Sequence, residues 1–365
     1  MIRCRSCLIP DTRPDTEFVE GECSACISYR KRQDTDWDDR KAQLIRLLEW
    51  ARAKGGAYDC IVPSSGGKDS TWQTLTLQEL GARVLVVTAT TCHLTPIGRK
   101  NIDNLARHAP MIEVTPNMTV RGKLNRLGLE LVGDVSWPEH ASIFTVPFRI
   151  AGAMNVPLIF YGECPQEAYG GPIGTETAMK MDGRWVTEFG GFLGLRATDL
   201  MGEQGITKHD MEHYRLPKPE VMDSVSAYFL GQFLPWDSHR NAIVAEQHGM
   251  RFAETTRANL WVAENLDNAQ TGLHDHLMYR KYGYGRLCAQ ASVDIRSGRF
   301  DRDRAMKLVV ERDGLFPYVY AGVTITDVLE RIGMTMPELD KLLDHFTQRA
   351  LFDGEVDRRP ILKGA

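Results

Sequence analysis

The chain has 365 residues, of which 43% are hydrophobic and 25% are charged, a composition typical of a water-soluble globular protein with two or three domains. The net charge of −4 disfavours extensive nucleic-acid binding, which usually requires a basic domain. The sequence contains neither an uninterrupted run of about 18 apolar residues nor the apolar core of an N-terminal signal peptide. We therefore expect a cytoplasmic protein that does not insert into a membrane.

Four of the eight cysteines are concentrated at the N-terminus, as Cys4-x-x-Cys7 and Cys23-x-x-Cys26. Each pair places two thiolates within reach of one ion, and two pairs complete a tetrahedral site without an open coordination position. The segment between the pairs has no core of its own, so a bound metal would supply much of its folding energy. We predict a structural zinc site, with an iron–sulfur cluster or two disulfides as the alternatives.

Beyond a charged stretch at residues 30–41, an amphipathic helix through Leu44, Leu48 and Ala51 leads into alternating strands and helices. The predicted strands are 58–62, 83–88, 111–114, 157–161 and 227–230. The predicted helices are 71–77, 97–108, 120–131, 141–155, one from 237 to about 248, and a largely helical region from 259 onward. Short β-branched runs separated by helices predict an α/β fold with a doubly wound parallel sheet. Residues 172–215 have weak hydrophobic periodicity, which suggests an insertion that lies over the ligand-binding edge of the sheet.

Residues 64–70 read Ser-Ser-Gly-Gly-Lys-Asp-Ser between the first predicted strand and the following helix. Two glycines let backbone N–H groups approach phosphate oxygens closely, and the helix N-terminus and a lysine add positive charge. The pattern differs from the Walker motif, and a solvated glycine turn is the plain alternative. We predict that this loop and the end of the second strand bind ATP through Ser64, Ser65, Gly66, Gly67, Lys68, Asp69, Ser70, Thr88 and Thr90.

The carboxyl ends of parallel strands meet at one edge of a sheet, so residues 64–70, 88–93 and 162–166 are expected around one crevice. Asp69 is expected to orient the loop or to bind Mg²⁺, with capping of the helix as the alternative. Glu163 and Gln166 are candidates for contacts to a substrate or ammonia, with a solvated loop carboxylate as the alternative for Glu163.

Ser65–Ser70 resembles the PP-loop of ATP pyrophosphatases, which split ATP into AMP and pyrophosphate. Further segments resemble one branch of that superfamily, the N-acetyl sugar amidotransferases of bacterial surface-polysaccharide and nonulosonate pathways. These segments are 95–101, 123–125, 133–140, 161–171, 233–237 and 265–275, and the resemblance runs from Cys4 to near Phe352. Cys164 departs from the expected polar residue, which leaves the finer substrate identity open.

The resemblance implies an enzyme that uses ATP and Mg²⁺ to adenylylate the acetamido oxygen of a nucleotide-linked N-acetyl sugar, after which ammonia yields an acetamidino group. It assigns catalysis to Lys68, Asp69 and Glu163. The residues it suggests for contacts to substrate or ammonia are Glu139, His140, Glu163, Gln166, Trp236 and Asp237.

The expected organisation is a Cys4 zinc module at 1–35, a PP-loop ATP-pyrophosphatase domain at 36–255 and a helical C-terminal region at 256–365. Cys164 lacks a glutaminase signature, so ammonia is expected from a separate glutaminase and a cyclase-like barrel, by analogy with the imidazole-glycerol-phosphate synthase pair. Free ammonium is the other source. The role of Cys164 and the oligomeric state, a homo-oligomer included, stay open.

Two rival hypotheses follow from the same residues. A PP-loop enzyme that modifies transfer RNA would also adenylylate an oxygen and can carry paired Cys-x-x-Cys motifs, but the net charge of −4 disfavours it. A nucleotide-binding scaffold without chemistry is the other, and the intact Lys68-Asp69-Ser70 sequence argues against it.

Overall fold

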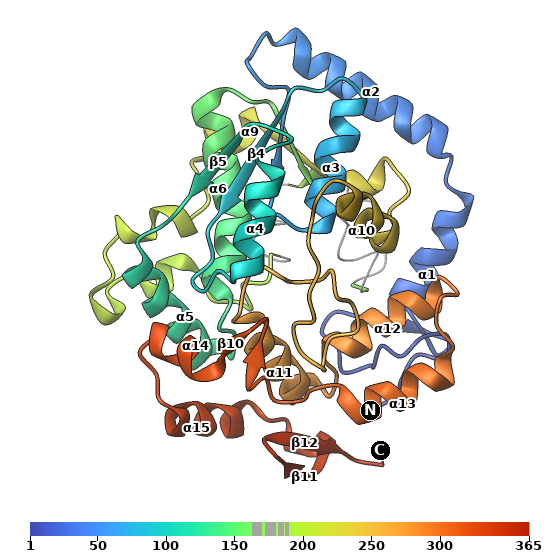
Figure 1. The fold of residues 1–365 in the computed structure, drawn as a ribbon, viewed down its shortest axis with the longest axis vertical. Helices are drawn as coiled ribbons and strands as arrows, with labels where there is room; N and C mark the ends of the chain where they lie inside the picture. Colours follow the sequence, from blue (N-terminus) through green and yellow to red (C-terminus); the bar gives the residue numbers. More distant parts are fainter. Residues whose placement is uncertain (163–169, 172–179, 182–185, 187–189, 365) are drawn as a thin grey trace.

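The computed structural model describes residues 1–162, 170–171, 180–181, 186 and 190–364 (Figure 1). At its centre lies a six-stranded sheet with the strand order β5-β4-β3-β6-β8-β7. The strands of this sheet are β3 (Cys60–Pro63), β4 (Val84–Ala89), β5 (Met111–Val114), β6 (Leu158–Tyr161), β7 (Lys180–Met181) and β8 (Ser226–Phe229). Five strands are parallel and the two-residue β7 is antiparallel to β8.

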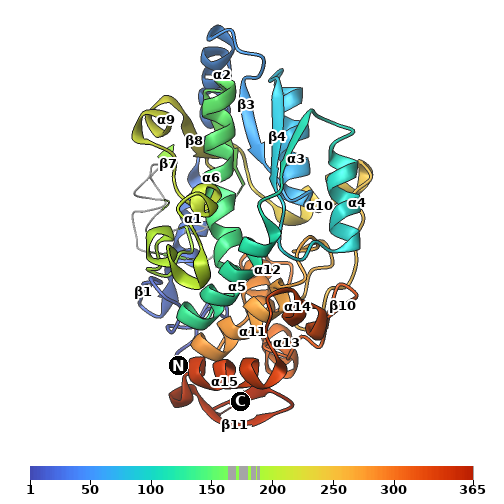
Figure 2. The same cartoon turned by 90° about the vertical axis from the view of Figure 1, so that its left-hand side faces the viewer.

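Helices cover both faces of this sheet, as Figures 1 and 2 show. Successive side chains of a strand point to opposite faces; in β3, Cys60 and Val62 pack into one core and Ile61 into the other. The first core includes side chains from α2 (Trp37–Ala53), α3 (Lys68–Glu79), α4 (Pro96–Leu105) and α10 (Ser238–Gln247). The second is covered by α6 (Trp137–Met154) and α9 (Pro219–Ser224). The predicted doubly wound α/β fold is confirmed.

The strand order reverses at β3. The chain proceeds outward from β3 to β4 and β5 and then returns through α5 (Met118–Val132) and α6 to place β6 on the other side of β3. In open α/β sheets, the crevice outside the carboxyl ends of the strands at such a reversal is where ligands bind. The loop at residues 64–67 and the end of β6 therefore flank the expected ligand site.

Much of the predicted insertion at 172–215 lies outside the described residues. Its described part contains the short helices η3 (Ala197–Leu200), η4 (Glu203–Gly205) and η5 (Asp210–Tyr214). Leu200, Ile206, Met211 and Tyr214 pack against side chains of α5 and α6. This part of the segment therefore covers those two helices.

The C-terminal region is helical, as predicted, but its helices begin later than the sequence pattern suggests. Residues 251–270 form a loop joined to Leu94 by one β-bridge at Asn268. The helices that follow are α11 (Thr271–Tyr282), α12 (Arg286–Arg296), α13 (Arg302–Arg312), α14 (Ile325–Arg331) and α15 (Met336–Phe346). A capping box formed by Thr335 and Glu338 starts α15. Two small hairpins accompany these helices, formed by β9 (Val319–Tyr320) with β10 (Val323–Thr324) and by β11 (Phe352–Val356) with β12 (Arg359–Leu362).

The N-terminal module contains the hairpin β1 (Phe18–Val19)–β2 (Glu22–Cys23), helix α1 (Ser24–Lys31) and the short η1 (Arg32–Asp34). It lies against α12 and α13 (Figure 1): Leu8 is buried among their side chains, and its backbone N–H donates to Ser292. Among the residues that the structure describes, no helix combines the length and apolar character needed to cross a bilayer.

Candidate active site and metal centre

A cavity of about 380 Å³ opens at the carboxyl ends of β3 and β6. All seven residues of the predicted phosphate loop, Ser64 to Ser70, line it. The end of β6 contributes Tyr161 and Gly162, α6 contributes Glu139, and the loop before α11 contributes Ala263 to Asp267. The sheet edge, α6 and the C-terminal region therefore meet around the loop.

The loop conformation depends on Gly66. Its φ of +76° lies in the left-handed region, and a Cβ there would come within 2.6 Å of the backbone nitrogen of Ile102 in α4. The Gly66 N–H donates to Ser64 Oγ at 2.9 Å, and Ser64 Oγ in turn lies 2.8 Å from Ser70 Oγ. Helix α3 begins at Lys68, so its positive N-terminal end faces the cavity.

Lys68 is 5% exposed and is held between two carboxylates. Its ammonium donates to Asp69 Oδ2 at 2.7 Å and to Glu264 Oε2. Burial lowers the pKa of Lys68, but these two carboxylates outweigh it and raise the pKa above its ordinary value. Asn241 in α10 donates to the other oxygen of Asp69 at 2.9 Å. Lys68 is thus a fixed positive charge beside the phosphate loop.

Among the described residues that line the cavity, negatively charged side chains outnumber positively charged ones. Glu139, Glu264 and Asp267 line it together with Asp69. Burial raises the pKa of Asp267 to about 6, and the negative charges of Glu139 and Glu264 add to this rise. Such a cluster of oxygen ligands fits a divalent cation, because Mg²⁺ binds through carboxylates and phosphate oxygens.

Glu139 is positioned by a buried polar network. Its Oε1 accepts from Arg121 Nη1 and from the backbone N–H of Cys92, both at 3.0 Å, and its Oε2 accepts from Asn125 Nδ2 at 2.6 Å. Arg121 has no exposed surface. This carboxylate is therefore held rigidly at the cavity wall.

The other predicted site residues lie in several places. Thr88 and Thr90 do not line the cavity: Thr88 Oγ1 faces Met111 Sδ and Thr90 Oγ1 bonds Thr115, whereas their neighbours Ala89 and Thr91 line it. The reason is the alternation of side chains along a strand. Glu163, Gln166 and Cys164 lie outside the described residues.

His140 lies beside Asp134, as described below, and is not part of the cavity wall. Trp236 and Asp237 line a second cavity of about 360 Å³. Asp237 also caps α10, accepting from His239 and Arg240. Trp236 packs edge-on against Trp72 of α3, and a Cβ on Gly162 would touch its ring at 3.3 Å.

Sequence reasoning missed Glu264 and Asp267. Their segment was predicted to be helical, whereas it is a loop that brings both carboxylates to the same cavity as residues 64–70. Two acidic residues within Ala263-Glu264-Asn265-Leu266-Asp267, a stretch without helical periodicity, were the signal that could have identified it.

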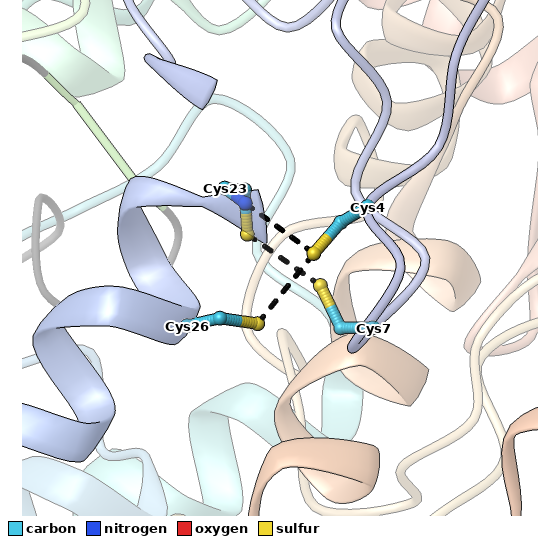
Figure 3. A group of neighbouring side chains, drawn as sticks. All are labelled: Cys4, Cys7, Cys23 and Cys26. Atoms are coloured by element: carbon cyan, nitrogen blue, oxygen red, sulfur yellow. Dashed lines mark hydrogen bonds between the residues drawn. The ribbon is translucent and has the colours of Figure 1, made fainter. Parts of the chain in front are cut away.

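The four N-terminal cysteines converge as predicted, all of them buried (Figure 3). Cys4 Sγ lies 3.8 Å from Cys26 Sγ, and Cys7 Sγ lies 3.6 Å from Cys23 Sγ. Four sulfurs bound to one tetrahedral ion at about 2.3 Å would be about 3.8 Å apart. The cluster therefore fits a single metal ion.

A comparison with protein-family models gives a match for the C-terminal part of the chain. Residues 248–360 match the family model described as "LPS biosynthesis protein WbpG-like, C-terminal domain". This region, called the WbpG-like region below, is similar to the domain that the model describes. The match supports the resemblance to N-acetyl sugar amidotransferases. The WbpG-like region includes Glu264 and Asp267, so it supplies two of the carboxylates that line the cavity. The sequence matches none of the curated proteins with which it was compared.

The solved structures that the chain matches include two synthetases and a thiolase. NMN synthetase from Francisella tularensis is 12% identical with a TM-score of 0.29, covering 61% of this chain and 99% of its own. NAD⁺ synthetase from Burkholderia pseudomallei is 15% identical with a TM-score of 0.29, covering 61% and 91%. The U34-tRNA thiolase from Methanococcus maripaludis, with its [4Fe-4S] cluster, is 11% identical with a TM-score of 0.35, covering 84% and 89%. The fold assignment itself rests on the strand order and the loop described above.

Proposed function

We propose that this protein is an ATP-dependent amidotransferase acting on a nucleotide-linked N-acetyl sugar in the biosynthesis of lipopolysaccharide O-antigen or a related surface glycan. One observation carries the proposal: the WbpG-like region and the phosphate loop line the same cavity. A loop suited to ATP and a region typical of lipopolysaccharide biosynthesis proteins thus contribute to one site.

The reaction begins with activation of the acetamido group. Amide resonance makes its carbon a poor electrophile, so the amide oxygen first attacks the α-phosphorus of ATP. This forms an O-adenylyl imidate and breaks the bond to pyrophosphate. The loop N–H groups, the N-terminus of α3 and Lys68 hold the departing pyrophosphate, which gains negative charge in the transition state.

Ammonia completes the exchange. It attacks the imidate carbon, AMP departs with the former amide oxygen, and loss of a proton leaves the acetamidine. Glu139 is placed to hold the incoming ammonium, because Arg121, Asn125 and the backbone N–H of Cys92 fix its carboxylate at the cavity wall. Glu163 and Gln166 are further proposed contacts for the sugar or ammonia.

The carboxylates of Asp69, Glu264 and Asp267 would hold Mg²⁺, which supplies charge neutralisation at the phosphates. The four carboxylates among the described residues of the cavity wall are the feature that fits a cation. The Cys4, Cys7, Cys23 and Cys26 cluster would hold Zn²⁺ in a structural role, because all four tetrahedral positions are filled by protein ligands.

We expect ammonia to come from a separate glutaminase with a cyclase-like barrel. The test combines the protein with ATP, Mg²⁺, ammonium at alkaline pH and a panel of nucleotide-linked N-acetyl sugars. One sugar should lose about 1 Da, the change from O to NH, with equimolar release of AMP and pyrophosphate. The Lys68→Met variant is the control that should give no product. If no sugar reacts but transfer RNA stimulates AMP release, a tRNA-modifying enzyme replaces this proposal; ADP and phosphate as primary products would exclude both.

A further inference from the structure

Outside the ATP cavity, three potential metal ligands converge from separate parts of the fold. Asp134 lies in the turn between α5 and α6, His140 lies near the start of α6, and His274 lies in α11. Asp134 Oδ2 is 3.0 Å from His140 Nδ1, and Asp134 Oδ1 is 2.9 Å from His274 Nδ1. One ligand atom from each side chain lies within 4.8 Å of the others.

Hydrogen bonding leaves part of this cluster unexplained. Asp134 is 1% exposed, and its Oδ1 is engaged by His274 and by the backbone N–H of Ser136 at 2.8 Å. Its Oδ2 and His140 Nδ1, though only 3.0 Å apart, lack hydrogen-bonding geometry and have no other hydrogen-bond partner among the described residues. Lys281 directs its ammonium at the carbonyl oxygens of Val132 and Gly133 at 3.2 and 3.1 Å. Buried carboxylate oxygens and imidazole nitrogens without a hydrogen bond to the protein usually contact a bound water molecule or ion.

The donor set identifies the class of that partner. Two imidazole nitrogens and one carboxylate oxygen are typical ligands of Zn²⁺ and neighbouring transition metals, and three protein ligands leave a position for water. The side chains of His140 and His274 are 29% and 24% exposed, so the cluster lies close to the surface. We propose that Asp134, His140 and His274 bind a divalent transition-metal ion of the zinc class, separate from the cysteine cluster.

Such an ion would join two regions of the chain next to the ATP cavity. His140 follows Glu139 directly, and His274 lies one turn of α11 after Gln270. Asn125 donates to Glu139 at 2.6 Å and to Gln270 at 3.4 Å. The ion would therefore fix α11 of the WbpG-like region against the part of α6 that positions Glu139.

The test is metal counting on the full chain. Protein stripped with a chelator, reloaded with Zn²⁺ and freed of excess should contain two ions per chain by mass spectrometry of the metal. His274→Asn should reduce this to one. His108→Asn is the matched control, because His108 is a half-buried histidine that lies 2.9 Å from the carbonyl oxygen of His248, and it should retain two.

Reloading with Co²⁺ separates the two sites. The cysteine cluster should give intense thiolate-to-cobalt absorption, whereas the histidine–aspartate site should add only weaker visible bands, which His274→Asn and His140→Gln should remove. The Co²⁺ spectrum of the wild-type protein already shows whether the second site binds metal. The test therefore holds even if neither variant folds. Thiolate absorption alone from wild-type protein, or a second ion retained by folded His274→Asn, would show that the three side chains form only an ordinary polar cluster.

Discussion

Replacing Lys68 with methionine removes a buried ammonium but keeps most of the side-chain volume. Asp69 and Glu264 then face each other without the cation that both contact. Removing one member of a buried ion pair typically costs about 3 to 5 kcal/mol. We expect the lower value, about 3 kcal/mol, because Asn241 still donates to Asp69 and protonation can relieve Glu264.

The rate of AMP release should also fall, for a reason that is independent of the loss of stability. Lys68 is proposed to act on charge that develops during the transfer, so the variant should release AMP at least about a hundredfold more slowly, equivalent to about 2.7 kcal/mol of transition-state stabilisation. Urea unfolding measures the first effect, and chromatographic detection of AMP under native conditions measures the second.

The double variant Lys68→Met/Glu264→Gln distinguishes the two effects. In the wild type, burial raises the pKa of Glu264, but Lys68 outweighs burial and the pKa is lowered. Without Lys68, burial alone should raise it, so the single variant should lose stability as pH rises through that pKa. Neutralising residue 264 should recover much of the stability and remove this pH dependence, while AMP release stays low. Recovery of AMP release in the double variant would refute a direct role of Lys68 in the transfer.

Three further predictions concern the metal, a carboxylate and the nitrogen source. Cys7→Ser should lower the metal content by one ion per chain and loosen the N-terminal module while sparing the sheet; iron and sulfide in elemental analysis of the wild type would contradict zinc. The pKa of Asp267 in the folded protein is raised to about 6, so the protonated carboxyl group stabilises the fold and this contribution is lost as pH rises through 6. Relative to Asp267→Asn, the free energy of unfolding of the wild type should therefore fall by up to about 3 kcal/mol between pH 4 and pH 7. A pH-independent difference between these two proteins would show that Asp267 titrates normally. The isolated chain should use ammonium but not glutamine, and Cys164→Ser should leave this activity intact; glutamine hydrolysis abolished by that variant would make Cys164 a nucleophile.

The sequence predicted those parts of the site whose residues are neighbours in the chain. Residues 64–70 are one contiguous stretch between a strand and a helix, and the cysteine spacing is a local pattern, so the position of the loop at the sheet edge and the convergence of the cysteines could be predicted. The partner of Lys68 could not, because Glu264 lies 196 positions away in a loop. Only tertiary packing brings these two side chains together.

The histidines give a similar lesson. The pair His274-x-His276 invites a search for a metal between its own members, yet residues two apart on a helix do not share a face. His276 instead bonds the carbonyl of Gly314 at 3.0 Å, and His274 meets Asp134, 140 positions away. Likewise, Thr88 and Thr90 were predicted at the correct sheet edge but in the wrong phase of the strand, because the boundary of a strand does not by itself reveal which face each residue occupies.

The contact between the N-terminal module and α12 has a consequence for synthesis of the protein. Leu8 and its partner Ser292 are separated by 284 positions, so at about 5 to 20 residues per second the ribosome needs about 15 to 60 s to deliver the second after the first. During that interval Leu8 lacks its packing surface on α12. Early capture of a metal ion by the nascent cysteine cluster would keep this segment compact, so the cellular supply of that metal during translation should affect how much of the chain escapes aggregation.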